Sequence, residues 1–128
     1  TDTHEKIDEE KSTFIFKRLS EAFTVQQQQA ELIKKHFEDC KFSKIICGDL
    51  NNSAFSYVYR TIKGDMKDAF EQAGTGFGKS YNYKYYPARI DYVFVEENIE
   101  VKEFKSIETF QQSDHFPQIT RLKIEEKE

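Results

Sequence analysis

The sequence predicts a single α/β (α+β) domain in which helices flank a mixed or antiparallel sheet. Three observations predict it. Residues 9–39 contain neither Gly nor Pro and carry apolar side chains at helical spacing. Residues 43–49 form a short apolar run that ends in Gly-Asp, as a buried strand does at a loop. Three strand-like segments then follow one another in the last third of the chain.

Size and composition suit one domain with a real core. The chain has 128 residues, of which 38% are hydrophobic and 15% aromatic. Its net charge of -4 disfavours a module held on duplex DNA by a basic surface, although a metal site can still engage a nucleic-acid phosphate. No apolar run approaches the roughly 20 residues of a membrane-spanning helix. The polar start at residues 1–12 suggests a cut within a longer protein, and the sequence leaves the cellular location open.

The first helical region is long. Its apolar side chains fall near one helical face up to Phe23 and near another from Ala30 onward. We therefore expect either one long helix or two helices with a break around Thr24. The predicted strand at 43–49 follows, and it makes Cys47 a small buried hydrophobe. A disulfide between Cys40 and Cys47 is possible but not required by the pattern.

Two short helices and a loop come next. Residues 51–64 begin with capping residues and end at Gly64. Residues 65–74 predict a second helix that Asp65 caps, with Asp68 in its first turn and a stop at the final glycine. Residues 74–87, rich in glycine and tyrosine, read as a long surface loop whose tyrosines either stack on a base or sugar or pack on their own domain.

The last third contains three strand-like segments. Residues 88–97 alternate in polarity as a strand does. Residues 99–109 are expected to pair with that strand as a hairpin or meander, and residues 118–126 form the last strand.

Three acid-bearing motifs lie at or within these strands. Gly48-Asp49-Leu50-Asn51 follows the first strand, and at a period of two Asp49 and Asn51 point the same way. An ordinary turn is the alternative. Asp91 interrupts an apolar strand, where it either faces solvent or accepts a hydrogen bond from an imidazole. Asp114-His115 precedes the last strand, where a solvated pair competes with a proton-transfer or metal role.

Taken together, "GDLNN", "RIDYVFV" and "SDHFP" resemble the second half of the endonuclease/exonuclease/phosphatase superfamily of metal-dependent phosphoesterases. The resemblance covers roughly residues 44–122. It implies that residues 1–128 form the C-terminal half of such a domain, one half of a four-layer α-β-β-α sandwich. The glycine-rich loop also resembles bacterial members of the family.

The resemblance also implies roles. Asp49 would orient or deprotonate the attacking water, and Asn51 would hold that water or a phosphate oxygen. His115 would donate to the scissile phosphate and Asp91 would orient it, so the expected catalytic residues are Asp49, Asn51, Asp91 and His115. Asp49 and Asp114 would hold Mg²⁺ or Mn²⁺, which prefer oxygen ligands. Expected substrate-binding residues are Asn51, Arg89 and Tyr83.

The implied activity is hydrolysis of a phosphoester or phosphodiester in a nucleic acid, an inositol phosphate or a lipid head group. The family's first-half Asn and metal-binding Glu have no counterpart in this sequence. We therefore expect the isolated chain to bind Mg²⁺ weakly and to hydrolyse little.

Half of a two-sheet sandwich would leave one sheet face uncovered, and this face is expected to drive self-association. A catalytically dead interaction module that keeps the fold is the alternative, and an unrelated α/β binding domain is a third reading.

Overall fold

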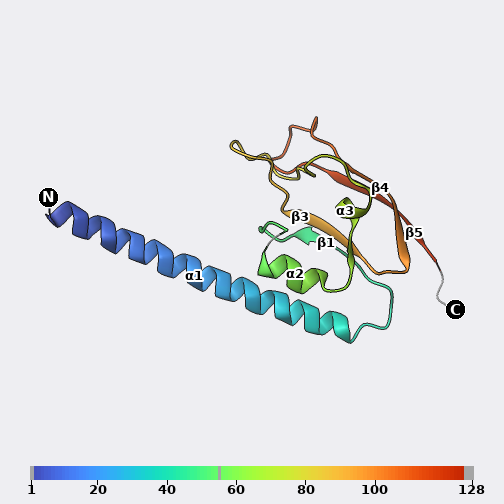
Figure 1. Ribbon diagram of the computed structural model, residues 1–128, viewed down its shortest axis with the longest axis horizontal. Coiled ribbons are helices and arrows are strands. Elements are labelled where there is room, and N and C mark those ends of the chain that lie inside the picture. Colours follow the sequence, from blue (N-terminus) through green and yellow to red (C-terminus); the bar gives the residue numbers. More distant parts are fainter. Residues whose placement is uncertain (1, 55, 126–128) are drawn as a thin grey trace.

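The computed structural model describes residues 2–54 and 56–125; residues 1, 55 and 126–128 of the expected domain lie outside the described residues. Figure 1 shows one very long helix lying beneath a small mixed body of helices and strands. The elements are α1 Asp2–Glu38, β1 Ile45–Asp49, α2 Tyr57–Lys63, β2 Lys67–Asp68, α3 Ala69–Ala73, β3 Asp91–Val95, β4 Ile99–Ser106 and β5 Gln118–Ile124.

Helix α1 is one continuous helix, which decides between the two expected alternatives. Thr24, the expected position of a break, stays helical, and its hydroxyl donates to the carbonyl of Ser20 one turn earlier. The second half of α1 lies along α2, while its first half extends past the rest of the described chain (Figure 1). Ala30, which is buried, marks the contact of α1 with the core.

The first sheet has the strand order β1-β3-β2, and both pairings are antiparallel. The register places Asp49 opposite Asp91 at one end of the β1-β3 pair. Tyr92 and Phe94 of β3 point to the same face and pack against Tyr59 of α2 in one aromatic cluster. Helices α1 and α2 therefore cover one face of this sheet.

The pairing expected for residues 99–109 was wrong. Strand β4 pairs with β5 in a separate two-stranded antiparallel sheet rather than with β3. The reason is that both edges of β3 are already taken, one by β1 and the other by β2. Strand β2 has two residues, too few for any alternation in polarity to reveal it.

The short helices begin and end at specific caps. Helix α2 ends at Gly64, as the sequence predicts, but it begins later than the capping-type residues at 51–53 suggested. Its N-cap is Ser56, whose Oγ accepts from the Tyr59 amide. For α3 the expected cap was wrong: Asp68, rather than Asp65, accepts from the Phe70 amide at the N-terminus. The expectation failed because residues 67–68 are extended and pair with β3, so the helix starts later.

The opposite face of the first sheet carries exposed apolar side chains. Ile45 in β1 is 43% exposed. Beside this face, Ile119 in β5 of the second sheet is 54% exposed. Cys47 is also exposed, so its expected burial was wrong, because its side of β1 has no covering layer among the described residues. Cys40 and Cys47 are both free thiols. The described chain therefore has the α+β class that the sequence predicts, and the complete four-layer sandwich stays a prediction.

Candidate active site

A histidine and an aspartate meet beside the end of the first sheet. The Nδ1 atom of His115 lies 2.8 Å from Oδ2 of Asp91, the first residue of β3. An ionised carboxylate can only accept, so Nδ1 carries the proton and Nε2 is left to face outward. This contact fixes the tautomer of the imidazole, and it is the contact that the position of Asp91 within an apolar strand suggested.

A second carboxylate completes the cluster. Oδ2 of Asp49 lies 3.7 Å from Nε2 of His115, on the side of the ring opposite Asp91. The antiparallel register of β1 with β3 brings the two aspartates to the same end of the sheet. The other oxygen of Asp49 accepts from the backbone amide of Asn51 at 2.8 Å, which holds the carboxylate in a turn. Three motifs distant in sequence therefore supply one cluster.

The cluster opens into a hollow of about 710 Å³ on the uncovered face of the sheet. Asp49, Asp91 and His115 line it together with Phe116 and with residues of β1, β3 and β5, both apolar and polar. His115 and Asp49 side chains are each 36% exposed, so both are within reach of a solute. The hollow can therefore admit a phosphate ester to the imidazole.

The electrostatics of the cluster favour a charged imidazole. The hydrogen bond that His115 donates to Asp91 raises the pKa of the imidazole above its ordinary value, and the negative charges of Asp91, Asp49 and Asp114 act in the same direction. Partial burial opposes them and lowers the pKa of the same group. The net rise keeps Nε2 protonated to a higher pH than in a free histidine, which suits a donor to a phosphate oxygen.

Residues 80–82 connect the segments that carry the cluster, and sequence reasoning did not identify them. The fully buried Ser80 accepts on Oγ from the amides of Ile90 and Asp91. Its carbonyl accepts from the amide of Phe116, directly after His115. The ring of Tyr81 packs edge-on against the imidazole, with centroids 5.1 Å apart. A buried serine in a loop of glycines and tyrosines has no sequence signal that separates it from a turn residue.

Arg89 and Tyr83, expected to bind substrate, lie elsewhere. Arg89 donates from Nη1 to both oxygens of the buried Asp68, and its guanidinium lies between the rings of Phe70 and Tyr92. Its side chain is 11% exposed, so the structure engages it in the core. Tyr83 contacts the rings of two neighbouring exposed tyrosines in the 81–86 loop. Neither residue lines the hollow beside His115.

Asn51 and Asp114 lie next to the cluster, but not as the sequence suggested. Asn51 has a positive φ of 52°, so it has left the strand, and the period-two argument for its direction does not apply. Asp114 is exposed, and its carbonyl accepts from the Asn82 amide. Its charge acts on His115, but its carboxylate is not among the three ligand groups that converge within the described chain.

The cluster has the chemistry of a cation site. One potential ligand atom each from Asp49, Asp91 and His115 lies within 4.8 Å of the others. Two carboxylates that face an open hollow suit a hard divalent cation that retains waters. Asp91 is already bonded to the imidazole, whereas Asp49 lines the hollow and has no side-chain donor within hydrogen-bonding distance among the described residues. Asp49 is therefore the carboxylate of the two that is more available to a cation. The fit supports a metal in general, without selecting Mg²⁺ or Mn²⁺.

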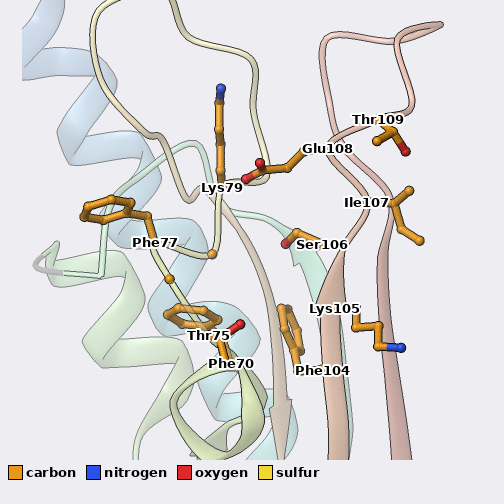
Figure 2. Close-up of a pocket in the computed structure, with 12 residues that line it drawn as sticks. Phe70, Thr75, Phe77, Lys79, Phe104, Lys105, Ser106, Ile107, Glu108 and Thr109 are labelled. Carbon is orange, nitrogen blue, oxygen red and sulfur yellow. The ribbon is translucent and has the colours of Figure 1, made fainter.

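A second hollow, of about 640 Å³, lies between the loop at 75–79 and the end of β4. Figure 2 shows the rings of Phe70 and Phe104 side by side at its base, with Lys79 and Glu108 higher up. None of the three residues of the cluster lines it. It is therefore a surface feature separate from the site.

No helix among the described residues is both long enough and apolar enough to span a lipid bilayer.

Comparison with solved structures gives the same fold for most of the chain. A mannosyl-6-phosphatase of Bacteroides thetaiotaomicron VPI-5482 is 20% identical, with a TM-score of 0.63 over 79% of this chain and 46% of that one. An endonuclease/exonuclease/phosphatase family protein of the same species is 21% identical, with a TM-score of 0.66 over 80% and 46%. A Bacteroides vulgatus protein of that family is 27% identical, with a TM-score of 0.64 over 78% and 44%.

The chain therefore spans less than half of the length of these solved structures. Among curated proteins, none matches it significantly. The sequence model described as the Endonuclease/Exonuclease/phosphatase family matches residues 19–115, which include all three motifs. With this match, the shared fold and the cluster of Asp49, Asp91 and His115, the chain belongs to the endonuclease/exonuclease/phosphatase family.

Proposed function

We propose that this chain is the C-terminal half of a divalent-metal-dependent phosphoric ester hydrolase. The observation that carries the proposal is the imidazole of His115, held by Asp91 at 2.8 Å and facing Asp49 at 3.7 Å across an open hollow. Phosphate ester hydrolysis needs a positioned water and a donor for the charge that develops on the phosphate oxygens. Asp49 and His115 offer these two functions on one rim.

In this proposal the residues have distinct tasks, and Asp49 has two. Asp49 orients or deprotonates the water, and the Asn51 side chain holds that water or a phosphate oxygen. Nε2 of His115 donates to the phosphate while Asp91 keeps the ring oriented. Asp49 and Asp114 would hold Mg²⁺ or Mn²⁺, which when bound neutralises charge on the phosphate oxygens. The cluster of potential ligand atoms supports this assignment for Asp49.

The proposal extends to the chain as a fragment. Because the matched part of this chain covers less than half of each solved structure, we expect residues 1–128 alone to bind the cation weakly and to hydrolyse little. The substrate stays a class, a phosphoester of a nucleic acid, an inositol phosphate or a lipid head group. One of the similar solved structures is a mannosyl-6-phosphatase, which adds a sugar phosphate to the compounds worth assaying.

Manganese binding tests the site without needing turnover. Adding Mn²⁺ to the labelled chain should broaden the amide NMR signals around Asp49 and Asp114 before others, because a paramagnetic ion relaxes nearby nuclei. Asp49→Asn should abolish this selective broadening, whereas Asp39→Asn, a control at an exposed carboxylate after α1, should not. Uniform broadening, or selective broadening that survives Asp49→Asn, would contradict the proposed ligand.

A hydrolysis assay tests the proposed chemistry. It uses a protein that contains these residues and is as long as the similar solved structures. With these four kinds of phosphoester and added Mg²⁺, His115→Ala and Asp49→Asn should each lower turnover by about 10²–10⁴-fold, the usual contribution of a general acid or base. Circular dichroism should show that both variants stay folded. Turnover absent from the unmodified protein on every phosphoester would instead favour the interaction module that keeps the fold.

A further inference from the structure

We infer that Ser80 is a positioning residue that holds Asp91 and His115 together by bonding to the backbone next to each of them. The inference assigns a role within the proposed site and so rests on the proposed function, but its test does not. Ser80 lies outside the three motifs, in the loop between α3 and β3. It is fully buried, unlike the exposed Tyr83, Tyr85 and Tyr86 later in the loop.

Ser80 thus bridges the backbone at Asp91 and the backbone at His115. The hydroxyl of Ser80 makes the Asp91 side of this bridge. Its Oγ accepts from the Ile90 amide at 2.9 Å and from the Asp91 amide at 3.1 Å. These amides belong to the turn into β3, where Asp91 is the first residue of the strand. The two bonds therefore fix the backbone from which the Asp91 carboxylate projects.

The other side of the bridge is made by the backbone. The carbonyl of Ser80 accepts from the Phe116 amide at 2.8 Å, and two residues later the Asn82 amide donates to the carbonyl of Asp114 at 2.7 Å. Residues 80–82 thus form a short extended segment that pairs with the chain on both sides of His115, as the bridge between Tyr81 and His115 also shows. The residues directly before and after His115 are therefore both hydrogen-bonded to this segment.

Among the described residues, the side chain of this segment that bonds to the turn into β3 is that of Ser80, whose hydroxyl accepts from two amides. The Ser80 amide donates to the carbonyl of Ala88 at 2.9 Å, which anchors the segment three residues before Asp91. The Asp91 carboxylate is bonded to His115, and the backbone from which it projects is held by Ser80 and by the pairing with β1. Removing the hydroxyl leaves the His115 side of the bridge intact and releases the Asp91 side.

The test measures which nitrogen of His115 carries the proton. In the unmodified chain at a fixed pH where the ring is neutral, long-range ¹H–¹⁵N correlations should show the Nδ1–H tautomer, because Asp91 accepts from Nδ1. Ser80→Ala should shift the population toward the Nε2–H tautomer, in the direction of the Asp91→Asn variant. In Asp91→Asn, adding Ser80→Ala should cause no further change, since the two act through one contact.

A matched control separates positioning from loss of stability. Ser56 also accepts one backbone amide on its hydroxyl, at the start of α2, so Ser56→Ala removes a bond of the same kind away from the site. It should leave the tautomer of His115 unchanged. An equal shift in Ser56→Ala, or an unchanged tautomer in a folded Ser80→Ala, would overturn the inference.

The unmodified chain gives a second measurement should Ser80→Ala fail to fold. The amides of Ile90 and Asp91 should exchange with solvent slowly, because both donate to a buried oxygen. Exchange as fast as that of the exposed loop at 83–86 would overturn the role of the hydroxyl. Each measurement gives its result whether or not the protein hydrolyses a phosphoester, so failure of the inference and failure of the proposed function are distinguishable.

Discussion

Arg89 donates from one nitrogen to both carboxylate oxygens of Asp68, at 3.1 and 2.8 Å, in the interior of the protein. The Asp68 side chain is completely buried, and it also accepts from the hydroxyl of Tyr59 at 2.7 Å and from the Phe70 amide. This pair joins the start of α3 to the residue that precedes the Ile90-Asp91 turn. A buried charge of this kind is tolerated because every oxygen has a donor.

Removing the arginine should therefore be costly. Arg89→Met keeps the volume but leaves the Asp68 charge without its ionic partner, and truncating one member of a buried pair typically costs about 3–5 kcal/mol. Urea unfolding followed by circular dichroism measures the change. Lys102→Met is the control, because its ion pair with Glu100 lies on the surface. A loss for Arg89→Met no larger than that of the control would contradict the structural role.

The raised pKa of His115 predicts a pH dependence of stability. A group whose pKa is higher in the folded than in the unfolded chain stabilises fully below the unfolded value, about 6.5 for histidine, and loses that contribution as the pH rises through the folded value. The free energy of unfolding should therefore fall as the pH rises through this window. Asp91→Asn removes the hydrogen bond that is the largest cause of the raised pKa, and should flatten the fall.

Urea titrations at several pH values from about 5 to 9 measure this dependence. His115→Gln is the control, since it removes the titrating group and should give a profile without this contribution. Profiles of the unmodified chain and Asp91→Asn that fall in parallel would show that Asp91 does not set the pKa of His115.

The parts of the site that could be predicted are those with a local signature. A carboxylate at the end of an apolar run marked Asp49, and a charge inside an apolar run marked Asp91. Their partners depend on contacts between distant segments, which no local pattern carries. Arg89 looked like a phosphate ligand because its partner Asp68 lies 21 residues away, and Ser80 looked like a turn residue because its burial follows from the packing of two other segments.

The same distinction holds for the fold. Capping-type residues at 51–53 drew the expected start of helix α2 ahead of Ser56, the residue that caps it, whereas its end was predictable because Gly64 is a local cap. The pairing of β4 was not, since it depended on β2, whose two residues occupy the remaining edge of β3. The open face of the first sheet could be anticipated only through the family resemblance, because the alternation along β1 does not say which side another layer covers.

Two glycines in the loop before the site form a matched pair. Gly76 and Gly78 both have positive φ, 70° and 65°, where a side chain costs roughly 1–2 kcal/mol. A Cβ at Gly76 would meet no atom within 4 Å, whereas at Gly78 it would lie 2.7 Å from the Phe70 ring and 2.8 Å from Arg89. Gly78→Ala should therefore lower the free energy of unfolding by about 1–3 kcal/mol more than Gly76→Ala, as overpacking does.

Urea unfolding of the two variants provides the comparison, since the strain from positive φ is common to both. Equal losses would show that the loop at 76–78 moves away from Phe70 and Arg89 without cost. The measurement therefore reports how rigidly this loop, two residues before Ser80, is held.

The open sheet face predicts that the chain associates with itself. Ile45 and Ile119 are half exposed, and Ile119 lines the hollow beside His115 together with apolar residues of β1 and β3. Apolar side chains gathered on one face favour burial against another surface, and β1 is also an edge strand of the sheet as far as the structure describes it. A second copy offers the same apolar face, so we expect a dimer whose formation depends on concentration.

Sedimentation velocity across a range of concentrations measures the association. Ile45→Lys and Ile119→Lys should each shift the chain toward monomer, because a charge on this face opposes its burial. Leu32→Lys is the control, since Leu32 is 71% exposed on α1, away from the sheet face. An unmodified chain that stays a folded monomer at every concentration would refute self-association. A dimer weakened by Leu32→Lys rather than by the two sheet variants would instead place the interface on the long helix.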